Sequence, residues 1–362
     1  MDLRIITVGN LTSFVAEAEF SQLPDIPITP LRALSQFQNP NSESDDPALI
    51  VAYDEGGKIL AYFGCLPDSL RQNKIEKVCW SSCWWVHPTK GQAAGMPVFY
   101  KALQLWNAKM LFDALPERSE AVLDKMGYFS FRKISGVHYF LRTKFHKIIP
   151  GRIPFLAPLK NIFFALDTLL NMPVQIKLAF QKRKNKLATN VSITQISEID
   201  KETESFLLPL AKNEVLQRSS QTFNWIIQQP WLSSNNSFTK KYFFSSHADH
   251  FENILLKIHQ DKKMIGFLWL SLRDGTAKLP YCYISPGHED IATSVLINQL
   301  IENPVDTFIC FQQNLLPSLA KAKSPFLYQK ELSKTFAWTT VLDSYFSPPF
   351  YVQDGDGDTC FT

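Results

Sequence analysis

The sequence has little excess of charge of one sign and no paired cysteines. Its 37 basic and 34 acidic side chains give a formal net charge of +3, which is too small to indicate a nucleic acid as a partner. The six cysteines are scattered through apolar segments, a pattern that predicts buried, reduced thiols and a cytoplasmic protein. Cys79 and Cys83 are four residues apart, but no second His or Cys pair follows them, so we expect no metal site.

Other signatures are missing as well. The seven histidines include no His-Glu-x-x-His spacing, and no Gly-x-Ser-x-Gly motif is present, so the common zinc-protease and serine-hydrolase patterns are excluded. No run of 18 uncharged apolar residues occurs, and we therefore expect no transmembrane segment. Hydrophobic residues make up 45% and charged residues 20% of the 362 positions, which is a globular composition with room for two domains.

The most informative stretch is 78–106. Residues 78–86 are apolar and rich in aromatics, which predicts a buried strand, whereas 98–106 mix apolar and polar side chains as in a helix packed on a sheet. The loop between them is small and glycine-bearing, with Pro97 at a plausible first helical position. A strand, a small-residue loop and a helix together present free backbone N–H groups that can bind a phosphate. Such a joint is about as often a simple connection.

The neighbouring segments extend this pattern into a recognisable order of elements. They are a hairpin with its turn at 55–58, a short strand at 109–115, a helix at 117–126 and a last strand at 136–142. This order, with Gln92-Ala93-Ala94-Gly95-Met96-Pro97 in the loop, resembles the GNAT superfamily of acyl-CoA-dependent N-acyltransferases. The loop of that family is Gln/Arg-x-x-Gly-x-Gly/Ala, and the resemblance covers roughly residues 1–145.

The resemblance implies a site for acetyl-CoA or another acyl-CoA as co-substrate. In the family, loop amides hold the pyrophosphate of coenzyme A, and the preceding strand splays to admit the pantetheine arm. Carried onto this sequence, the resemblance implies that Val86 and His87 contact the arm. It implies phosphate contacts from the loop residues Gln92, Ala93, Ala94, Gly95 and Met96.

Three positions depart from the family pattern. Pro97 stands where the family has Gly or Ala, so one N–H donor is missing. Leu123 occupies the place of a tyrosine that often serves as general acid, and Ser81 occupies the place of a frequent carboxylate base. His87 is the one ionisable side chain beside the expected cleft, so it is the candidate catalytic residue that would take a proton from an ammonium acceptor. The alternative is that His87 only faces solvent before Pro88.

The same plan restarts at residue 191. Strand and helix patterns recur in the same order to about residue 345, which resembles a second, degenerate GNAT unit. Its loop, 284–290, lacks the Gln-x-x-Gly core, and Glu289 and Asp290 would repel a pyrophosphate, so this half is not expected to bind coenzyme A. We predict an α/β (α+β) protein of two tandem GNAT-like domains, each a mixed, mostly antiparallel sheet flanked by helices. The predicted domains are 1–145 and 191–362, joined by a helical linker at 146–190.

The second half also holds candidate acceptor contacts. In tandem GNAT proteins, one half often loses its cofactor site and the acceptor tends to lie between the halves. Arg218, Asn224 and Trp225 are candidates for binding the substrate, because polar and aromatic groups gather there outside a clean helical period. Packing of Trp225 within an ordinary helix is an equally good interpretation. The acceptor class that we expect is a small-molecule amine or amino sugar.

The linker carries a long apolar pattern with a basic end. Residues 160–186 are apolar along much of their length, contain Pro173 and finish in a cluster of Lys and Arg. We favour a connector helix with its apolar side against both domains. The alternative is a helix that lies on an anionic membrane surface.

The C-terminal segment holds three aspartates at alternate positions. Asp354, Asp356 and Asp358 imitate the start of a calcium loop, but the glutamate that such a loop needs at its twelfth position does not follow. We therefore predict a flexible acidic turn.

Three functional hypotheses follow from the sequence. The first is an enzyme that moves an acyl group, by preference acetyl, from acyl-CoA to a primary amine. The departures at positions 81, 97 and 123 favour a second hypothesis, a catalytically inactive GNAT-fold binding or regulatory module. The third is a Fem-like aminoacyl transferase that uses aminoacyl-tRNA, and the near-neutral charge disfavours it.

Overall fold

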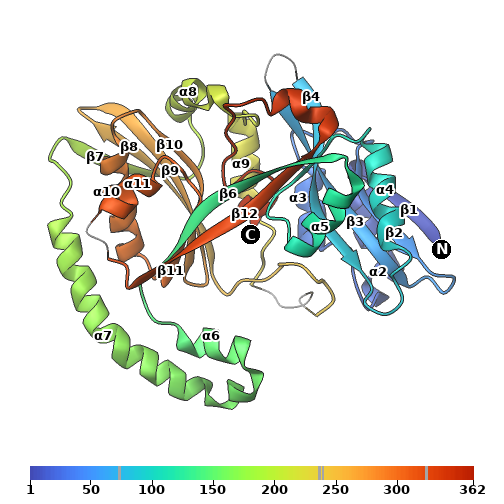
Figure 1. Ribbon diagram of the computed structural model, residues 1–362, viewed down its shortest axis with the longest axis horizontal. Helices are drawn as coiled ribbons and strands as arrows, with labels where there is room; N and C mark the ends of the chain where they lie inside the picture. The colour runs from blue at the N-terminus through green and yellow to red at the C-terminus, as the bar shows by residue number, and fades with distance from the viewer. Residues whose placement is uncertain (72–74, 235–237, 239, 323–324) are drawn as a thin grey trace. The chain divides into compact units, whose positions relative to one another are not determined.

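The computed structural model describes residues 1–71, 75–234, 238, 240–322 and 325–362, and it forms two compact units (Figure 1). Unit 1 comprises Met1–Ile134, Glu198–Phe251 and Lys334–Thr362. Unit 2 comprises Ser135–Ser197 and Glu252–Ser333. Both units therefore contain segments from both halves of the sequence.

Unit 1 contains strands in the order β1-β2-β3-β4-β5-β12. β4 and β5 pair in parallel, and the other pairs described in this unit are antiparallel. The strands are β1 (Asp2–Thr7), β2 (Pro47–Tyr53), β3 (Ile59–Arg71), β4 (Ile75–Val86), β5 (Met110–Phe112), residues 129–134 of β6 (Phe129–Phe140) and residues 334–339 of β12 (Tyr328–Thr339). The helices are α1 (Leu11–Ala16), α2 (Ala18–Gln22), α3 (Pro30–Phe37), α4 (Gly95–Leu105), α5 (Glu117–Met126), α8 (Lys201–Leu210) and α9 (Ser220–Gln228).

Unit 2 repeats this plan with the strand order β6-β11-β10-β9-β8-β7. β10 and β11 pair in parallel, as β4 and β5 do in unit 1. The strands are residues 135–140 of β6, β7 (Val191–Ile196), β8 (Phe251–Gln260), β9 (Lys263–Arg273), β10 (Thr276–Ile284), β11 (Thr307–Cys310) and residues 328–333 of β12. The helices are α6 (Phe145–Arg152), α7 (Lys160–Lys184), α10 (Glu289–Glu302) and α11 (Leu316–Lys321). The predicted fold class, two mixed and mostly antiparallel sheets flanked by helices, is confirmed.

Both faces of the sheet in unit 1 are buried. Because side chains alternate along a strand, Leu49 and Val51 of β2 enter one apolar cluster, while Ile50 and Ala52 enter another. The first cluster includes side chains from α1 and the second includes the buried face of α4. Unit 2 has its own core, in which apolar side chains of α10 pack with those of β9 and β10. All six cysteines are buried.

The two halves of the sequence exchange their last strands. β6 follows β5 and α5 in the chain, yet its residues 137–140 pair with β11 in unit 2. β12 follows β11 and α11, yet Ala337 and Trp338 pair with Phe112 and Leu111 of β5 in unit 1. Each sheet is thus completed by a strand from the other half.

This exchange makes the compact units differ from the domains expected at 1–145 and 191–362. A strand pattern shows that a segment is extended and which face is apolar, but it does not show which strand will pair with it. The segment 198–251, expected in the second domain, also belongs to unit 1.

The expected linker at 146–190 is helical and belongs to unit 2. Pro173 lies inside α7, where the helix continues through it. Many large apolar side chains of this segment are exposed, so the packing that we expected of a connector helix is not what the structure shows. Among the described residues, the helix Pro154–Lys184 is long and apolar enough to cross a membrane by length and composition, and 17% of its most apolar window is buried. A search for uncharged apolar runs missed this helix because polar and charged residues interrupt its apolar sequence.

The exchange predicts that the first half cannot fold alone. A chain of residues 1–150 lacks β12 and the segment 198–251, so β5 would keep an unpaired edge and the core of unit 1 would be open. We expect this fragment to be insoluble or to show no cooperative thermal transition by circular dichroism, in contrast to the full chain. A cooperative transition in the fragment would contradict the exchanged arrangement.

Candidate functional site

The strand, loop and helix predicted around residue 90 are present in unit 1. β4 ends at Val86 and α4 begins at Gly95, so the loop covers residues 87–94. The helix start is held against the strand end because the indole N–H of Trp84 donates to the Gly95 carbonyl (3.2 Å) and the Trp84 ring stacks on Phe99. Pro97 is the third residue of α4, whereas the sequence had suggested that it would be the first.

β4 and β5 pair over a short length and then separate. Their parallel pairing is formed by Cys79 with Met110 and by Trp80 with Leu111, and β5 ends at Phe112. β4 continues to Val86, paired with β3 on its other edge. In the described sheet, residues 81–86 of β4 therefore have one unpaired edge, whose N–H and C=O groups can bind an extended ligand. Ser82 forms a bulge here, because Gly64 pairs with Cys83 while Cys65 pairs with Ser81.

The loop next to this edge presents free amide donors. Gln92 and Ala93 are exposed, and their N–H groups have no acceptor among the described residues, nor do those of Gly95 and Met96. The N–H of Ala94 is different, because it donates to the Gly91 carbonyl (2.8 Å). N–H groups at the start of a helix of this length carry partial positive charge and suit a phosphate. The four free donors are among the residues that the sequence assigned to phosphate binding.

Two glycines allow the loop to lie close to the sheet. A Cβ at position 95 would be 2.7 Å from Cγ2 of Val86, and one at position 91 would be 2.1 Å from the carbonyl oxygen of Leu60. A side chain at either position would therefore push the loop away from the strand end. Position 95 of the motif therefore requires glycine because it packs closely against β4. The same close packing places the first backbone N–H groups of α4 beside the unpaired edge.

His87 does not have the geometry of a general base. The backbone N–H groups of Thr89 and Lys90 point at its Nδ1 at 3.3 and 3.2 Å, so this nitrogen is the acceptor of the turn. In the neutral ring, Nε2 then carries the proton, and no lone pair is left for a substrate. The arrangement favours a structural role for His87, while contacts of Val86 and His87 with a pantetheine arm stay a prediction.

Unit 2 has the equivalent joint with the opposite charge. β10 and β11 pair through residues 276–278 and 307–309, and α10 follows β10 after a short loop. Glu289 and Asp290 lie in the first turn of α10. Their carboxylates already complement the helix dipole and would repel a phosphate. The geometry is consistent with the expectation that this half does not bind coenzyme A.

The three candidate acceptor contacts all lie in unit 1 and have structural partners there. Arg218 lies between Asp68 (3.2 Å) and Asp356 (3.3 Å), with 4% of its side chain exposed. The Asn224 amide oxygen accepts from the Ile199 N–H (2.7 Å). The Trp225 indole N–H donates to the Ser35 carbonyl (2.8 Å). Asn224 and Trp225 help to line a small hollow of about 290 Å³, whereas Arg218 is not among its lining residues. The structure therefore does not bring the three together as one binding site.

The C-terminal aspartates are ion-pair partners: Asp354 and Asp356 are buried and Asp358 is partly buried. Residues 354–358 form the predicted turn, but its carboxylates are held by cations and the turn is not the free acidic loop that we expected. Asp354 contacts Lys334 (2.8 Å), Asp356 contacts Arg218 (3.3 Å) and Asp358 contacts Arg32 (2.8 Å). Asp356 is 1% exposed. These carboxylates can lie away from water because each one forms an ion pair with a cation, which offsets the cost of desolvation. The cations were missed because they lie in other segments of the chain, at positions 32, 218 and 334. Arg218 was noticed, but for another role.

Arg32 also connects the tail with the splayed strand. Its guanidinium donates to the Ser82 carbonyl at the bulge of β4 (3.2 Å) and to the Tyr242 hydroxyl, and it lies over the Trp231 ring at 3.8 Å. Burial raises the pKa of the nearby Cys83 thiol to about 11, so this thiol stays protonated at neutral pH. The cluster therefore fixes the shape of the bulge without supplying a nucleophile.

Replacing Gly95 by alanine tests the close approach of the loop. We expect Gly95→Ala to lower the free energy of unfolding by about 1–3 kcal/mol, because its Cβ would overlap Val86. The double variant with Val86→Ala should lose less than the sum of the single variants. Gly56→Ala is the control, since its Cβ would meet no atom closer than 3.4 Å. Equal effects of the two glycine changes in urea unfolding would contradict the packing role.

The buried tail predicts a pH dependence of stability. Burial raises the pKa of Asp356 to about 6, although Arg218 acts in the opposite direction. Because the folded-state pKa lies above the ordinary value, this group's contribution to stability is complete below about pH 4 and is lost as the pH rises to about 6. The free energy of unfolding of the wild type relative to Asp356→Asn should fall by roughly 2 kcal/mol between pH 4 and pH 6. A difference that stays constant with pH would show that Asp356 is ionised in the folded protein throughout.

Comparison with known proteins gives likenesses in structure alone. No protein-family model matches the chain, and no curated protein sequence matches it. A conserved protein of unknown function from Enterococcus faecalis V583, described as a probable N-acyltransferase, is 11% identical, with 95% of this chain and 74% of that chain covered and a TM-score of 0.52. Saccharomyces cerevisiae N-myristoyltransferase with bound myristoyl-CoA is 12% identical (93% and 78% covered, TM-score 0.49). A tandem GNAT protein from the clavulanic acid biosynthesis pathway is 14% identical (93% and 98% covered, TM-score 0.47).

The likeness in fold to the first of these structures agrees with the geometry of the chain. Both units have antiparallel strands followed by a parallel strand–helix–strand crossover, and in both units the two parallel strands pair over a short length. In unit 1 the crossover carries the predicted glycine-bearing loop. The chain is therefore a GNAT-fold protein with two GNAT-like units.

Proposed function

We propose that this protein is an acyl-CoA-dependent N-acyltransferase that moves an acyl group, by preference acetyl, to a primary amine. The observation that carries the proposal is the unpaired edge of β4 at residues 81–86, which leads directly into a loop with four free amide donors. An extended pantetheine arm suits the edge, and a pyrophosphate suits the loop. The glycines at 91 and 95 leave room for the loop to lie at that distance from the strand.

The chain's own residues would act mainly by positioning. A bound acyl-CoA supplies a thioester, whose acyl carbon is the atom that an amine attacks. Backbone N–H groups on the unpaired edge of β4 are placed to donate to the developing oxyanion. Holding the amine next to the thioester supplies a further large part of the rate. A small amine or amino sugar that enters in its neutral form needs no strong base on the protein.

Three observations favour a second candidate function, a coenzyme A-binding module without transfer activity. Leu123, at the place of the family's acid, is fully buried in the core of unit 1. His87 is engaged by backbone amides, and Pro97 offers no N–H to the loop. This candidate shares the binding site with the first and differs from it only in chemistry.

A change at Ala93 tests the binding site that both candidates share. Ala93→Asp places a carboxylate beside the free amides, and because Ala93 is exposed the melting temperature should stay nearly unchanged. We expect the affinity for acetyl-CoA, measured by calorimetry, to fall by at least about tenfold, which corresponds to about 1.4 kcal/mol. Ala121→Asp, the same change at an exposed position of α5, is the control and should bind as the wild type does. Gly95→Asp would be a poorer test, because its Cβ overlaps Val86.

Two outcomes separate the candidates. If the wild type binds acetyl-CoA and releases free thiol when amines or amino sugars are added, the enzyme is supported. Binding without thiol release across such a panel would support the binding module instead. Absence of binding, or equal affinity in Ala93→Asp, would remove the basis of both.

A further inference from the structure

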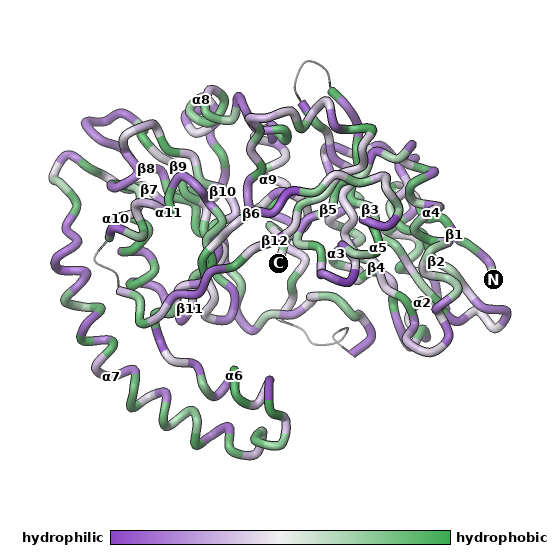
Figure 2. Tube along the Cα trace, viewed as in Figure 1, coloured by the Kyte–Doolittle hydropathy of each residue, from purple (hydrophilic) through white to green (hydrophobic). Residues whose placement is uncertain are grey.

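The outer side of α7 carries a continuous row of exposed apolar side chains. We call this row the apolar stripe; its members are Leu159 just before the helix and Ile162, Leu166, Leu169, Ile176 and Phe180 within it. Their exposed fractions lie between 41% and 64%. Spacings of three, four or seven residues place all of them on one face of the helix. Figure 2 shows apolar positions recurring along the whole of α7.

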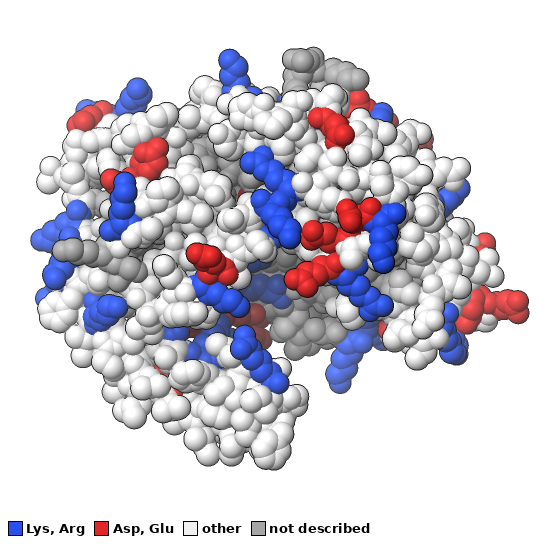
Figure 3. Space-filling model, viewed as in Figure 1, with Lys and Arg blue, Asp and Glu red and all other residues white. Residues whose placement is uncertain are grey.

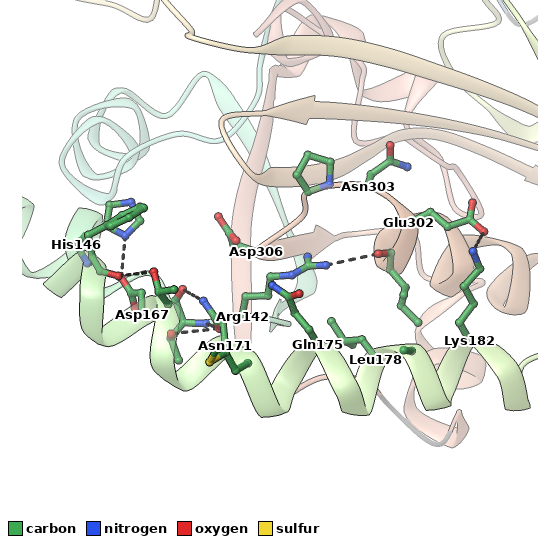
Figure 4. Close-up of a pocket in the computed structure, with 17 residues that line it drawn as sticks. Arg142, His146, Asp167, Asn171, Gln175, Leu178, Lys182, Glu302, Asn303 and Asp306 are labelled. Carbon is green, nitrogen blue, oxygen red and sulfur yellow. Dashed lines mark hydrogen bonds and ion pairs between the residues drawn. The ribbon is translucent and has the colours of Figure 1, made fainter. Parts of the chain in front are cut away.

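The opposite face of α7 is fixed to unit 2 by polar contacts (Figure 4). Asp167 accepts from the backbone N–H groups of Phe145 and His146, both at 2.9 Å. Asn171 accepts from the N–H of Thr143 (2.9 Å), and Lys182 contacts Glu302 (2.9 Å). These contacts lie along the length of the helix, so α7 cannot rotate to bury the stripe without breaking them.

The segment that carries the stripe is strongly basic. Between residues 144 and 186 the chain has nine Lys or Arg and one acid, Asp167, which is 4% exposed. Because the whole chain has a net charge of only +3, the remainder is net negative. Most of the basic residues stand near the two ends of the stripe: Lys147, Arg152 and Lys160 near its start, and Lys182, Arg183, Lys184 and Lys186 after it. Lys177 lies between Ile176 and Phe180. In Figure 3 the part of the surface where Figure 1 places α6 and the adjoining end of α7 is mostly white, with Lys or Arg side chains at its upper edge.

We propose that the α6–α7 segment docks unit 2 on an anionic lipid surface. The stripe would enter the boundary between headgroups and acyl chains, and the flanking Lys and Arg would contact anionic headgroups. A helix of 25 residues is about 38 Å long, so it can lie flat with every member of the stripe at one depth.

Two other occupants fit these observations less well. A membrane-spanning helix has to bury its full circumference, but α7 holds Asp167 and Asn171 on one face and Lys177 within its apolar length. If a second copy of the chain docked here, the Lys and Arg side chains of both copies would face each other, and their like charges would repel. The proposal goes beyond acyl transfer and does not depend on it.

Co-sedimentation of the full chain with lipid vesicles tests the proposal. We expect binding to vesicles of phosphatidylcholine with 30% phosphatidylglycerol at about 50 mM salt, weak binding to pure phosphatidylcholine, and release at about 500 mM salt. Arg183→Gln with Lys184→Gln and Lys186→Gln should weaken binding by about a hundredfold. Leu169→Ser with Ile176→Ser should weaken it by at least about tenfold. Both variants change exposed side chains, so folding should be preserved.

Matched controls use exposed residues elsewhere. Lys262→Gln with Lys263→Gln and Lys330→Gln removes three charges from other parts of unit 2, and Leu208→Ser removes an apolar side chain that is 73% exposed on α8. Both should bind as the wild type does. Because the six native cysteines are buried, Leu169→Cys can be labelled with a polarity-sensitive dye. Its emission should shift to the blue with anionic vesicles, whereas a label at Ser192→Cys should not respond.

Several outcomes would overturn the proposal. These are no binding to any vesicle, binding unaffected by both α7 variants, and binding that resists high salt and alkaline washing, as a spanning helix would. A dimer in solution that the stripe variant dissociates, without vesicle binding by the wild type, would assign the surface to a second copy.

Discussion

Non-local strand pairing is the constraint on which the rest of this structure depends. β5 has only three residues, yet it pairs with β4 on one edge and with β12 on the other. Because β5 is so short, residues 81–86 of β4 pair with β3 on one edge but have no partner strand on the other in the described sheet, and this free edge is the candidate ligand edge. A longer β5 would close that edge with backbone hydrogen bonds. The pairing with β12 keeps so short a strand in place, because an isolated three-residue edge strand would have little to hold it.

The buried tail adds a second constraint on unit 1. Lys334 contacts both Asp113 and Asp354, and Arg218 contacts both Asp68 and Asp356. Two carboxylates sharing one cation in a buried place cannot both be fully compensated, and burial accordingly raises the pKa of Asp113. Loss of the cation from either group would leave two buried carboxylates without compensation, at a cost of about 3–5 kcal/mol or more. Buried ion pairs of this kind add little to the net stability, but they determine which segments of the chain come together. Here they hold the tail next to Arg32, Arg218 and, through Lys334, Asp113.

The sequence predicted local features well and long-range partnerships poorly. The strand ending at Val86, the helix beginning near Gly95 and the acidic start of α10 all follow from short patterns whose physical causes are local. The destination of 136–142 could not be predicted, because its apolar pattern is the same whichever sheet it joins. The burial of the aspartates at 354–358 was not predicted for a similar reason. Alternate carboxylates are typical of exposed turns, and the three cations that pair with them lie in other segments of the chain. His87 was chosen for its position, but its role depends on the amides of Thr89 and Lys90, which only the folded turn reveals.

The exchanged strands also have a consequence for synthesis in the cell. A ribosome makes the chain from its N-terminus, so residues 1–134 emerge long before 334–362, which unit 1 needs for its sheet and for its buried charges. Until then β5 keeps an open edge, and Arg32 and Arg218 lack the carboxylates of Asp358 and Asp356. Unit 2, which needs nothing beyond residue 333, can be complete first. Folding would then reverse the order of translation, and a nascent chain would expose the unit with the candidate ligand site to aggregation or to chaperones until residues 334–362 are made.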